Sequence, residues 1–369
     1  MPSPHPPPPP PPPKSILLLG AGELGTAILT SLATHPALST GPTHFTIALR
    51  PSSLSDTPRL ASLRALAPAA AIAFAGLDLA SATAERELTA LILRGPHDVV
   101  IGCTGYAGSG GGTATSGTQA LIARAVLAAA AADKSDDENK KKIHFFPWQF
   151  GADYDVTGPD AAGGLMAEQC GVRALLREAK TTTTTGGAVD WTVVSTGMFM
   201  SFVFEEWFGV VEGLGPALRA GGPEPLSDGG GVVVRALGGW DTRVTLTDVR
   251  DIGRVVAELV VAPPPAGEGS RGEDGGSVVF AAGETVTYGE LADVVQKVVG
   301  RRAKVRREEW SLEHLRAELE KDPKDQTKRY RVFFGEGNGV SWDKEKTINA
   351  ERNIESTGVE QWLREKLSM

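Results

Sequence analysis

A short apolar run followed by a glycine triplet places the strongest limit on how this chain can fold. Residues 15–19 read SILLL, and residues 20–25 read GAGELG. An apolar run bounded by glycine is typical of a parallel strand that is buried on both faces. The apolar residues of 26–32 then recur at helical spacing. The chain therefore opens with a buried strand, a glycine turn and a helix.

Strand-like and helix-like segments alternate beyond this point. Further strands are expected at 45–49, 71–75, 98–102 and 143–146, and helices at 60–66, 84–93 and 119–132. Such alternation gives a parallel sheet with helices on both faces. We expect an α/β fold with a doubly wound parallel sheet of the Rossmann, NAD(P)-binding type.

The 369 residues exceed the ~250–300 at which a single core stops growing, so a second lobe is expected. Residues 1–13 are mostly proline and form a solvated tail. We assign residues 14–160 to the NADP-binding domain and 161–369 to a smaller C-terminal substrate lobe interleaved with the sheet. Later strands are expected at 189–194, 243–246 and 278–280, and helices at 249–261, 288–299 and the highly charged 301–321.

Composition excludes several function classes. The chain carries 45 acidic and 37 basic residues, and this acidic balance argues against a nucleic-acid partner. No run reaches the ~18 apolar residues of a membrane span, and no secretion signal is present, so a cytoplasmic protein is expected. Two cysteines and scattered histidines predict neither a disulfide framework nor a metal site. A homodimer stays open, and a partner for the proline tail is not favoured.

The glycine triplet predicts a pyrophosphate site because of its position between strand and helix. Gly20 permits the tight turn, Gly22 lets the backbone approach the pyrophosphate, and Gly25 allows close helix packing. Glu23 and Leu24 follow at the start of the helix, where free N–H groups and the positive end of the dipole favour phosphate.

The end of the second strand distinguishes NADP from NAD. A carboxylate there would bind the ribose 2′-hydroxyl, but this strand is followed by Arg50, with Ser52 and Ser53 close behind. Arginine binds phosphate bidentately, so we predict NADP(H) as the cofactor. Asp78, after the third strand, is a candidate for the adenine side, with an ordinary turn aspartate as the alternative.

The ends of the fourth and fifth strands are expected at the nicotinamide half. Small residues after the fourth strand suit close passage of the ribose. Aromatic residues after the fifth strand are candidate walls for the nicotinamide or an aromatic substrate, with simple core packing as the alternative. The candidate contacts are Thr104, Gly105, Tyr106, Trp148, Gln149 and Phe150.

Reduction of a carbonyl also requires a proton donor. None of the four tyrosines has a lysine four residues later, so the usual short-chain dehydrogenase pair is absent. Tyr154 is a candidate acid because Asp153 and Asp155 flank it. Those carboxylates are alternatively caps of the following segment.

Several segments together resemble a known family. The chain from Ser15 to about Leu367 is similar to the isoflavone-reductase-like, NmrA-like family, an atypical branch of short-chain reductases. The most specific segments are FFPWQFGADYD (145–155), VDWTVVSTGMF (189–199) and TDVRDIGRVVAELV (247–260), beside GAGELG and Arg50. The resemblance implies reduction of a small aromatic or phenylpropanoid-like compound by NADPH. Its closest likeness is to fungal members, which often accompany secondary-metabolite pathways.

One departure from the family concerns catalysis. In the plant reductases a catalytic lysine shortly precedes a Val-Arg pair, and the matching position here is Gln169, before Val172 and Arg173. Glutamine cannot transfer a proton, although its amide can orient a carbonyl or a water. Tyr154, Glu168 or water then supplies the proton. We expect an NADPH-dependent oxidoreductase acting on a small aromatic or polyketide- or peptide-derived metabolite; the alternative is an NmrA-like dinucleotide-binding regulator without turnover.

Overall fold

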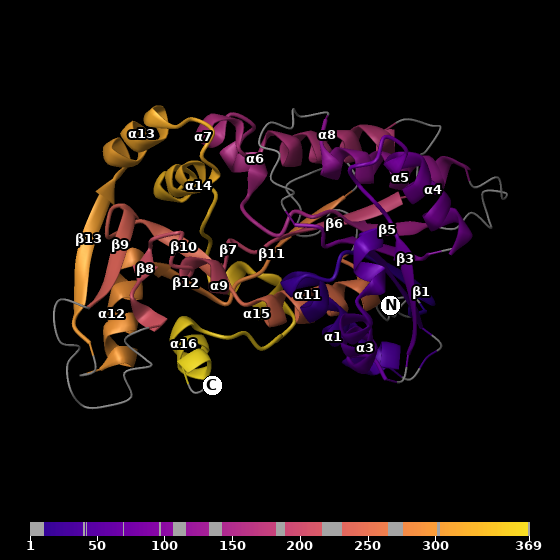
Figure 1. Ribbon diagram of the computed structural model, residues 1–369, viewed down its shortest axis with the longest axis horizontal. Helices are drawn as coiled ribbons and strands as arrows, with labels where there is room; N and C mark the ends of the chain where they lie inside the picture. The colour runs from indigo at the N-terminus through magenta and orange to yellow at the C-terminus, as the bar shows by residue number, and fades with distance from the viewer. Residues whose placement is uncertain are drawn as a thin grey trace, which may run out of the picture.

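The computed structural model describes residues 11–39, 41, 43–68, 70–95, 97–105, 116–132, 142–181, 189–215, 231–264, 276–300 and 303–367. The chain forms two lobes side by side: one contains most of the N-terminal half together with α11, and the other contains most of the C-terminal strands and helices (Figure 1). No described helix is long and apolar enough to cross a lipid bilayer.

A seven-stranded sheet, ordered β11-β6-β5-β4-β1-β2-β3, forms the centre of the larger lobe. Every pairing in this sheet is parallel, which confirms the predicted doubly wound fold. The strand order reverses between β1 and β4, and this switch point is where such folds bind ligands. The strands are β1 (Ser15–Leu19), β2 (His44–Leu49), β3 (Ala71–Gly76), β4 (Val99–Gly102), β5 (Ile143–Phe146), β6 (Val189–Ser195) and β11 (Ser277–Phe280).

Helices cover both faces of this sheet (Figure 1). Helices α1 (Glu23–Thr34), α3 (Thr57–Ala65) and α11 (Val249–Val261) pack on one face, and α4 (Ala84–Arg94), α5 (Thr118–Ala132) and α8 (Ala167–Thr181) on the other. In β1, Ile16 and Leu18 pack in the core on the α1 face of the sheet, whereas Leu17 and Leu19 pack in the core on the α5 face. Burial on both faces explains why this strand is apolar throughout.

The second lobe contains two small sheets and its own core. One sheet pairs β9 (Val232–Gly238) with β8 (Val211–Glu212) and β13 (Val305–Ser311), and the other joins β7 (Met198–Phe199), β10 (Arg243–Thr247) and β12 (Glu284–Thr287). The longer helices are α12 (Tyr288–Val299), α13 (Leu312–Lys321), α14 (Gln326–Gly335) and α16 (Val359–Leu367). The short helical turns of the whole described chain, from either lobe, are α2 (Pro36–Ser39), η1 (Pro51–Ser55), α6 (Tyr154–Thr157), α7 (Ala161–Gly164), α9 (Met200–Val203), η2 (Lys344–Lys346) and α15 (Ile348–Glu351).

The helix expected over 301–321 is wrong in its first half. Strand β13 occupies part of this stretch and pairs in parallel with β9 over seven residues. Arg235 of β9 lies 2.7 Å from the Glu308 carboxylate of β13, so charges that suggested a solvated helix instead pair across strands. Charged side chains are a common protection for an edge strand.

The boundary expected at residue 160 falls before α8, β6, α11 and β11, all of which belong to the larger lobe. The two lobes are therefore assembled from interleaved stretches of chain.

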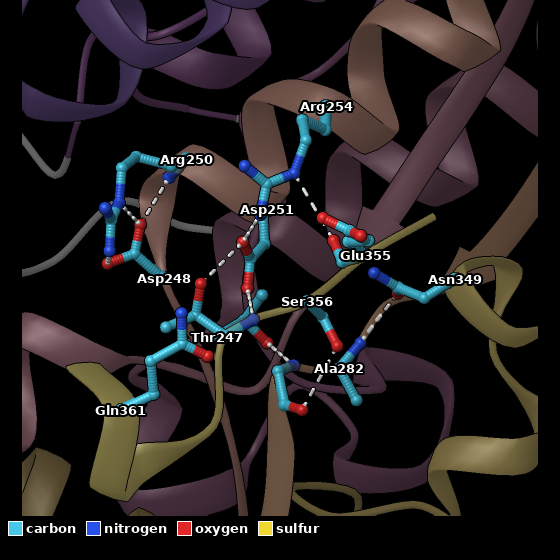
Figure 2. A network of polar contacts seen from close by, with 12 residues as sticks. Thr247, Asp248, Arg250, Asp251, Arg254, Ala282, Asn349, Glu355, Ser356 and Gln361 are labelled. Atoms are coloured by element: carbon cyan, nitrogen blue, oxygen red, sulfur yellow. Dashed lines mark hydrogen bonds and ion pairs between the residues drawn. The ribbon is translucent and has the colours of Figure 1, made fainter. Parts of the chain in front are cut away.

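A buried polar network ties the C-terminal segment to helix α11 (Figure 2). The fully buried Asp251 carboxylate accepts hydrogen bonds from Thr357 N (2.7 Å) and Thr357 Oγ1 (3.2 Å), and it pairs with Arg254. Burial raises the pKa of Asp251, and the Thr357 contacts and Arg254 oppose that rise. Nearby, Thr247 Oγ1 donates to Thr196 O at 2.6 Å. This network fixes the turn after β6, which leads to Phe199.

Candidate functional site

A cleft of about 1060 Å³ opens at the carboxyl ends of the central strands, around the switch point between β1 and β4. Dinucleotides bind across such a crevice, so we name its β2–β3 side the adenine end and its β4–β5 side the nicotinamide end. The cleft is lined by Leu19, Gly20, Ala21, Gly22, Glu23, Leu24, Ala48, Leu49, Arg50, Ser53, Arg59, Leu77, Asp78, Leu79, Ala80, Cys103, Thr104, Gly105, Thr118, Trp148 and Phe199.

The glycine loop forms the middle of the cleft, and its three glycines meet different surroundings. Gly20 has φ +101°, and a Cβ there would lie 2.8 Å from Cys103 O. A Cβ on Gly25 would collide with Gly20 O. A Cβ on Gly22, in contrast, would meet no atom within 4 Å. The first and third glycines therefore serve packing, whereas the second faces open space of the kind a pyrophosphate requires.

Helix α1 begins directly after Gly22, so its free N–H groups lie at the cleft. Leu24 is buried in the wall. The Glu23 carboxylate accepts a hydrogen bond from Ser201 Oγ at 3.3 Å. Ser201 belongs to α9 of the second lobe, so this contact joins the two lobes beside the glycine loop.

Two arginines stand at the adenine end. Arg50 follows β2, is exposed and lines the cleft. Arg59, in the first turn of α3, also lines it and donates from Nη2 to Ala21 O of the glycine loop at 3.1 Å. Ser53 reaches the cleft, but Ser52 is not part of its lining. The sequence analysis missed Arg59; the available signal was Asp56, which caps α3 by accepting from Arg59 N and so fixes that residue in the first turn.

Asp78 lies at the adenine end and also shapes its own turn. It follows β3, lines the cleft and accepts a hydrogen bond from Ala80 N at 3.0 Å through Oδ1. Leu77 and Leu79 flank it in the cleft wall. Asp78 is therefore a turn aspartate that also lines the cleft, and its contact with the adenine stays a prediction.

The nicotinamide end is lined by Thr104, Gly105, Thr118, Trp148 and Phe199. Tyr106 lies outside the described residues. Cys103 is buried beneath the glycine loop, and burial raises the pKa of its thiol well above the usual range, so it remains protonated. Thr118 and Phe199 were not assigned from the sequence, although Phe199 ends the segment that carries the family resemblance.

Gln149 and Phe150 do not line the cleft. Phe150 is packed in the core on the α1 face of the sheet. The buried Gln149 side chain donates to Gln169 O at 3.0 Å and accepts from Arg173 Nε at 2.7 Å. Gln149 therefore braces the turn after β5 against α8, behind the wall that Trp148 forms.

Tyr154 belongs to the core of the second lobe, with the Arg173 guanidinium 5.1 Å from its ring centre. Burial raises the pKa of Tyr154 to about 12, although Arg173 opposes the rise. Asp153 caps α6 by accepting from Asp155 N, and Asp155 pairs with Arg173 and Arg177. Both carboxylates thus hold local structure.

The two candidate residues on α8 are also turned away from the cleft. Gln169 is fully buried, and within the described part of the chain neither its Oε1 nor its Nε2 has a hydrogen-bond partner. Glu168 accepts hydrogen bonds from Gln119 N and Ala120 N at the start of α5. Like Tyr154, neither residue forms part of the cleft wall.

The sheet, the glycine loop and the cleft at the switch point define a Rossmann-type protein whose site fits a nicotinamide dinucleotide. No protein-family model matches the chain. A curated protein of Gibberella moniliformis, named an NmrA-like family domain-containing oxidoreductase, is 36% identical over 356 residues, which cover 95% of this chain and 97% of the relative. The chain belongs to the NmrA-like family, as its resemblance predicted.

A solved structure supports the fold independently. A nucleoside-diphosphate-sugar epimerase of Staphylococcus aureus superposes with a TM-score of 0.57 and 16% identity, covering 95% of this chain and 99% of the epimerase. At this identity the similarity concerns the fold alone.

Proposed function

We propose that this protein is an NADPH-dependent oxidoreductase that reduces a small aromatic or polyketide- or peptide-derived metabolite. The observation that carries the proposal is the pair of cleft-lining arginines, Arg50 and Arg59, beside a glycine loop with open space at Gly22. The oxidoreductase name of the relative from Gibberella moniliformis supports the reaction class. A role in cytoplasmic secondary metabolism is part of the proposal, in line with the fungal members that this chain resembles.

The preference for NADPH rests on charge at the end of β2. Within the described residues, the Arg50 guanidinium has no hydrogen-bond or ion-pair partner, so it is available to a ligand phosphate. A guanidinium binds a phosphate through two parallel hydrogen bonds, which a ribose hydroxyl cannot reproduce. Arg59 adds a second positive charge and is already oriented by Ala21 O.

The aromatic substrate class rests on the walls of the nicotinamide end. The bound reduced cofactor would supply a hydride, and Trp148 and Phe199 would provide flat apolar surfaces that exclude water and orient a planar carbonyl compound. The chain continues from Phe199 into α9, where Phe202 packs edge-on against Trp207 at 5.0 Å. Trp207 is 53% exposed, so this aromatic pair carries exposed apolar surface.

Water is the proton donor that this arrangement favours. Among the described residues that line the cleft, the titratable side chains are Glu23, Arg50, Arg59, Asp78 and Cys103. Arg50, Arg59 and Asp78 stand at the adenine end, the Glu23 carboxylate accepts a hydrogen bond from Ser201 Oγ, and Cys103 keeps its proton. Tyr154, with its pKa raised to about 12, lies in the other core.

The same observation favours a second candidate function, a dinucleotide-binding regulator without turnover. A site that binds NADPH tightly, and whose described residues offer no acid beside the nicotinamide, suits a sensor as well as a slow reductase. Turnover separates the two functions, because both require binding.

Fluorescence titration of the purified protein with NADPH and NADH tests the proposal, followed by NADPH consumption against aromatic aldehydes, ketones and enones. Tight NADPH binding with turnover supports the reductase. Tight binding without turnover on any of these classes favours the regulator. A folded protein that binds neither dinucleotide overturns both.

A further inference from the structure

The Thr104 hydroxyl at the nicotinamide end has a defined hydrogen-bond polarity. Gln119 Nε2 lies 3.0 Å from Thr104 Oγ1 and 3.5 Å from Gly105 O. A carbonyl oxygen can only accept, so the two neighbours together place the amide nitrogen, and not the amide oxygen, on this side of Gln119. Thr104 Oγ1 therefore accepts from Gln119, and its own proton is free to point elsewhere.

Gln119 is held in place by the start of helix α5. Its side chain is 6% exposed, and its backbone N–H lies 2.5 Å from Glu168 Oε1. The same oxygen accepts from Ala120 N at 3.1 Å. The first N–H groups of a helix have no partner within the helix, and the positive end of the dipole favours a carboxylate, so Glu168 of α8 anchors the first turn of α5.

The backbone at Gly117 leaves the space that the Glu168 carboxylate occupies. Gly117 precedes α5 with φ +136°, a conformation that side chains rarely adopt, and a Cβ at this position would collide with the Glu168 carboxylate. Only glycine thus leaves room for Glu168 at the helix start. This fit links the α5 start to Glu168 independently of the hydrogen bonds.

We propose that Gln119 and Glu168 are positioning residues that hold the Thr104 hydroxyl as a hydrogen-bond donor into the cleft, toward the nicotinamide ribose of the bound dinucleotide. The inference rests on the proposed NADPH binding. Thr104 and Thr118 both line the cleft, and Thr104 follows β4, on the nicotinamide side of the switch point. Glu168 then contributes to the site through α5, without touching the cofactor.

The test compares the affinity for NADPH with the affinity for a ligand that carries only its adenine half. Kd values are measured by fluorescence for NADPH and by calorimetry for adenosine 2′,5′-bisphosphate, which carries only the adenine half. The variants are Thr104→Val, Thr104→Ser, Gln119→Met, Glu168→Gln and Glu168→Ala, with Glu178→Ala as a matched exposed carboxylate on the same helix. Melting temperatures check that each variant is folded.

One lost hydrogen bond should weaken NADPH about five- to tenfold in Thr104→Val and Gln119→Met. The double variant should be no weaker than Thr104→Val alone, because one change removes the donor hydroxyl and the other removes only the amide that orients it. Thr104→Ser should bind as the wild type does. Glu168→Ala should lose more affinity than Glu168→Gln, whose amide oxygen still accepts from α5. Bisphosphate binding should remain within about twofold in every variant.

Three results would overturn the inference. Gln119→Met could bind NADPH like the wild type, or the double variant could show the two losses added together. Equal weakening of NADPH and the bisphosphate would show that the network only supports the fold. A folded wild type that binds the bisphosphate and NADPH equally weakly would instead remove the proposed cofactor, and the inference with it.

Discussion

The adenine end of the cleft comes from one continuous stretch of chain, whereas the nicotinamide end is assembled from separate segments. Residues 19–80 supply the glycine loop, both arginines and Asp78. The nicotinamide end takes Thr104 from the end of β4, Thr118 from the start of α5, Trp148 from the turn after β5, and Phe199 from β7. The first end therefore depends on local sequence, and the second depends on how distant elements pack.

The polar groups of the two ends also differ in what they bind. At the adenine end, Arg50 is exposed and has no partner within the described residues. Behind the nicotinamide end, Gln149 binds Arg173, and Glu168 binds the start of α5. The adenine end presents the Arg50 charge to the cleft, whereas the charges and amides behind the nicotinamide end hold neighbouring elements together.

The largest expected effect concerns two glycines that receive the same substitution. Gly22→Ala should leave the melting temperature unchanged but abolish measurable NADPH binding, because the new methyl group enters the space for the pyrophosphate. Gly25→Ala should lower the melting temperature and also abolish NADPH binding, because its Cβ collides with Gly20 O. Thermal melting and NADPH titration check both variants. Undiminished binding by Gly22→Ala would show that the cofactor does not pass this residue.

The two arginines should differ in selectivity. Arg50→Ala should weaken NADPH about 10- to 100-fold and NADH very little, because a charge-assisted contact to the 2′-phosphate is lost. Arg59→Ala should weaken both dinucleotides, because Arg59 also supports the glycine loop through Ala21 O. Parallel titrations of each variant measure the ratio. An equal loss of both dinucleotides in Arg50→Ala would contradict the assignment of NADPH.

The sequence predicted the central sheet well because each strand carries its own signal. The SILLL run, the glycine loop and the periodic helices are local patterns, and the structure places β1, α11 and α12 at the expected residues. Strand β13 was missed because its charged residues acquire their meaning only from β9, far away in sequence. The place of Arg50 in the cleft could be predicted from its strand end alone, and its role toward NADPH stays a prediction.

The candidate acids required information that the sequence does not contain. Adjacent helical residues point about 100° apart, so the pattern of α8 cannot tell whether Glu168 or Gln169 faces the cleft. That direction is set by α5, which receives the Glu168 carboxylate. Tyr154 likewise follows a motif beside the switch point, but its ring is taken into the core of the second lobe.

Acid should loosen the nicotinamide side of the sheet. His144 on β5 has a ring nitrogen 2.9 Å from Thr192 Oγ1 on β6, and burial lowers its pKa to about 4, with Asp190 opposing the decrease. The unfolded chain, with a pKa near 6.5, binds the proton more readily. The neutral His144 ring therefore contributes roughly 2–3 kcal/mol to the free energy of unfolding above pH 6.5, and this contribution is lost as the pH falls toward 4.

Urea unfolding between pH 7.5 and 4 measures this contribution, with His144→Gln as the comparison. The variant should lack this part of the pH dependence, and the wild type should lose stability between pH 6.5 and 4. His44→Gln is the control, since it changes an exposed histidine at the start of β2. An unchanged pH profile in His144→Gln would place the acid sensitivity elsewhere.

The smallest expected effect concerns the residue that the sequence made the leading acid. Tyr154→Phe removes a hydroxyl from the core of the second lobe while retaining the ring that packs under Arg173. If water supplies the proton, kcat for NADPH oxidation should change less than about threefold, with stability reduced by about 1 kcal/mol through the lost hydrogen bond of the hydroxyl with the Ala152 backbone. Steady-state kinetics with the best substrate of the carbonyl panel, together with thermal melting, measure the two quantities. A loss of kcat by 100-fold or more at unchanged NADPH affinity would mean that the second lobe opens during turnover and delivers this hydroxyl to the nicotinamide end. The difference between the adenine end, with its charge facing the cleft, and the internally bonded nicotinamide end would then hold only for the protein without substrate.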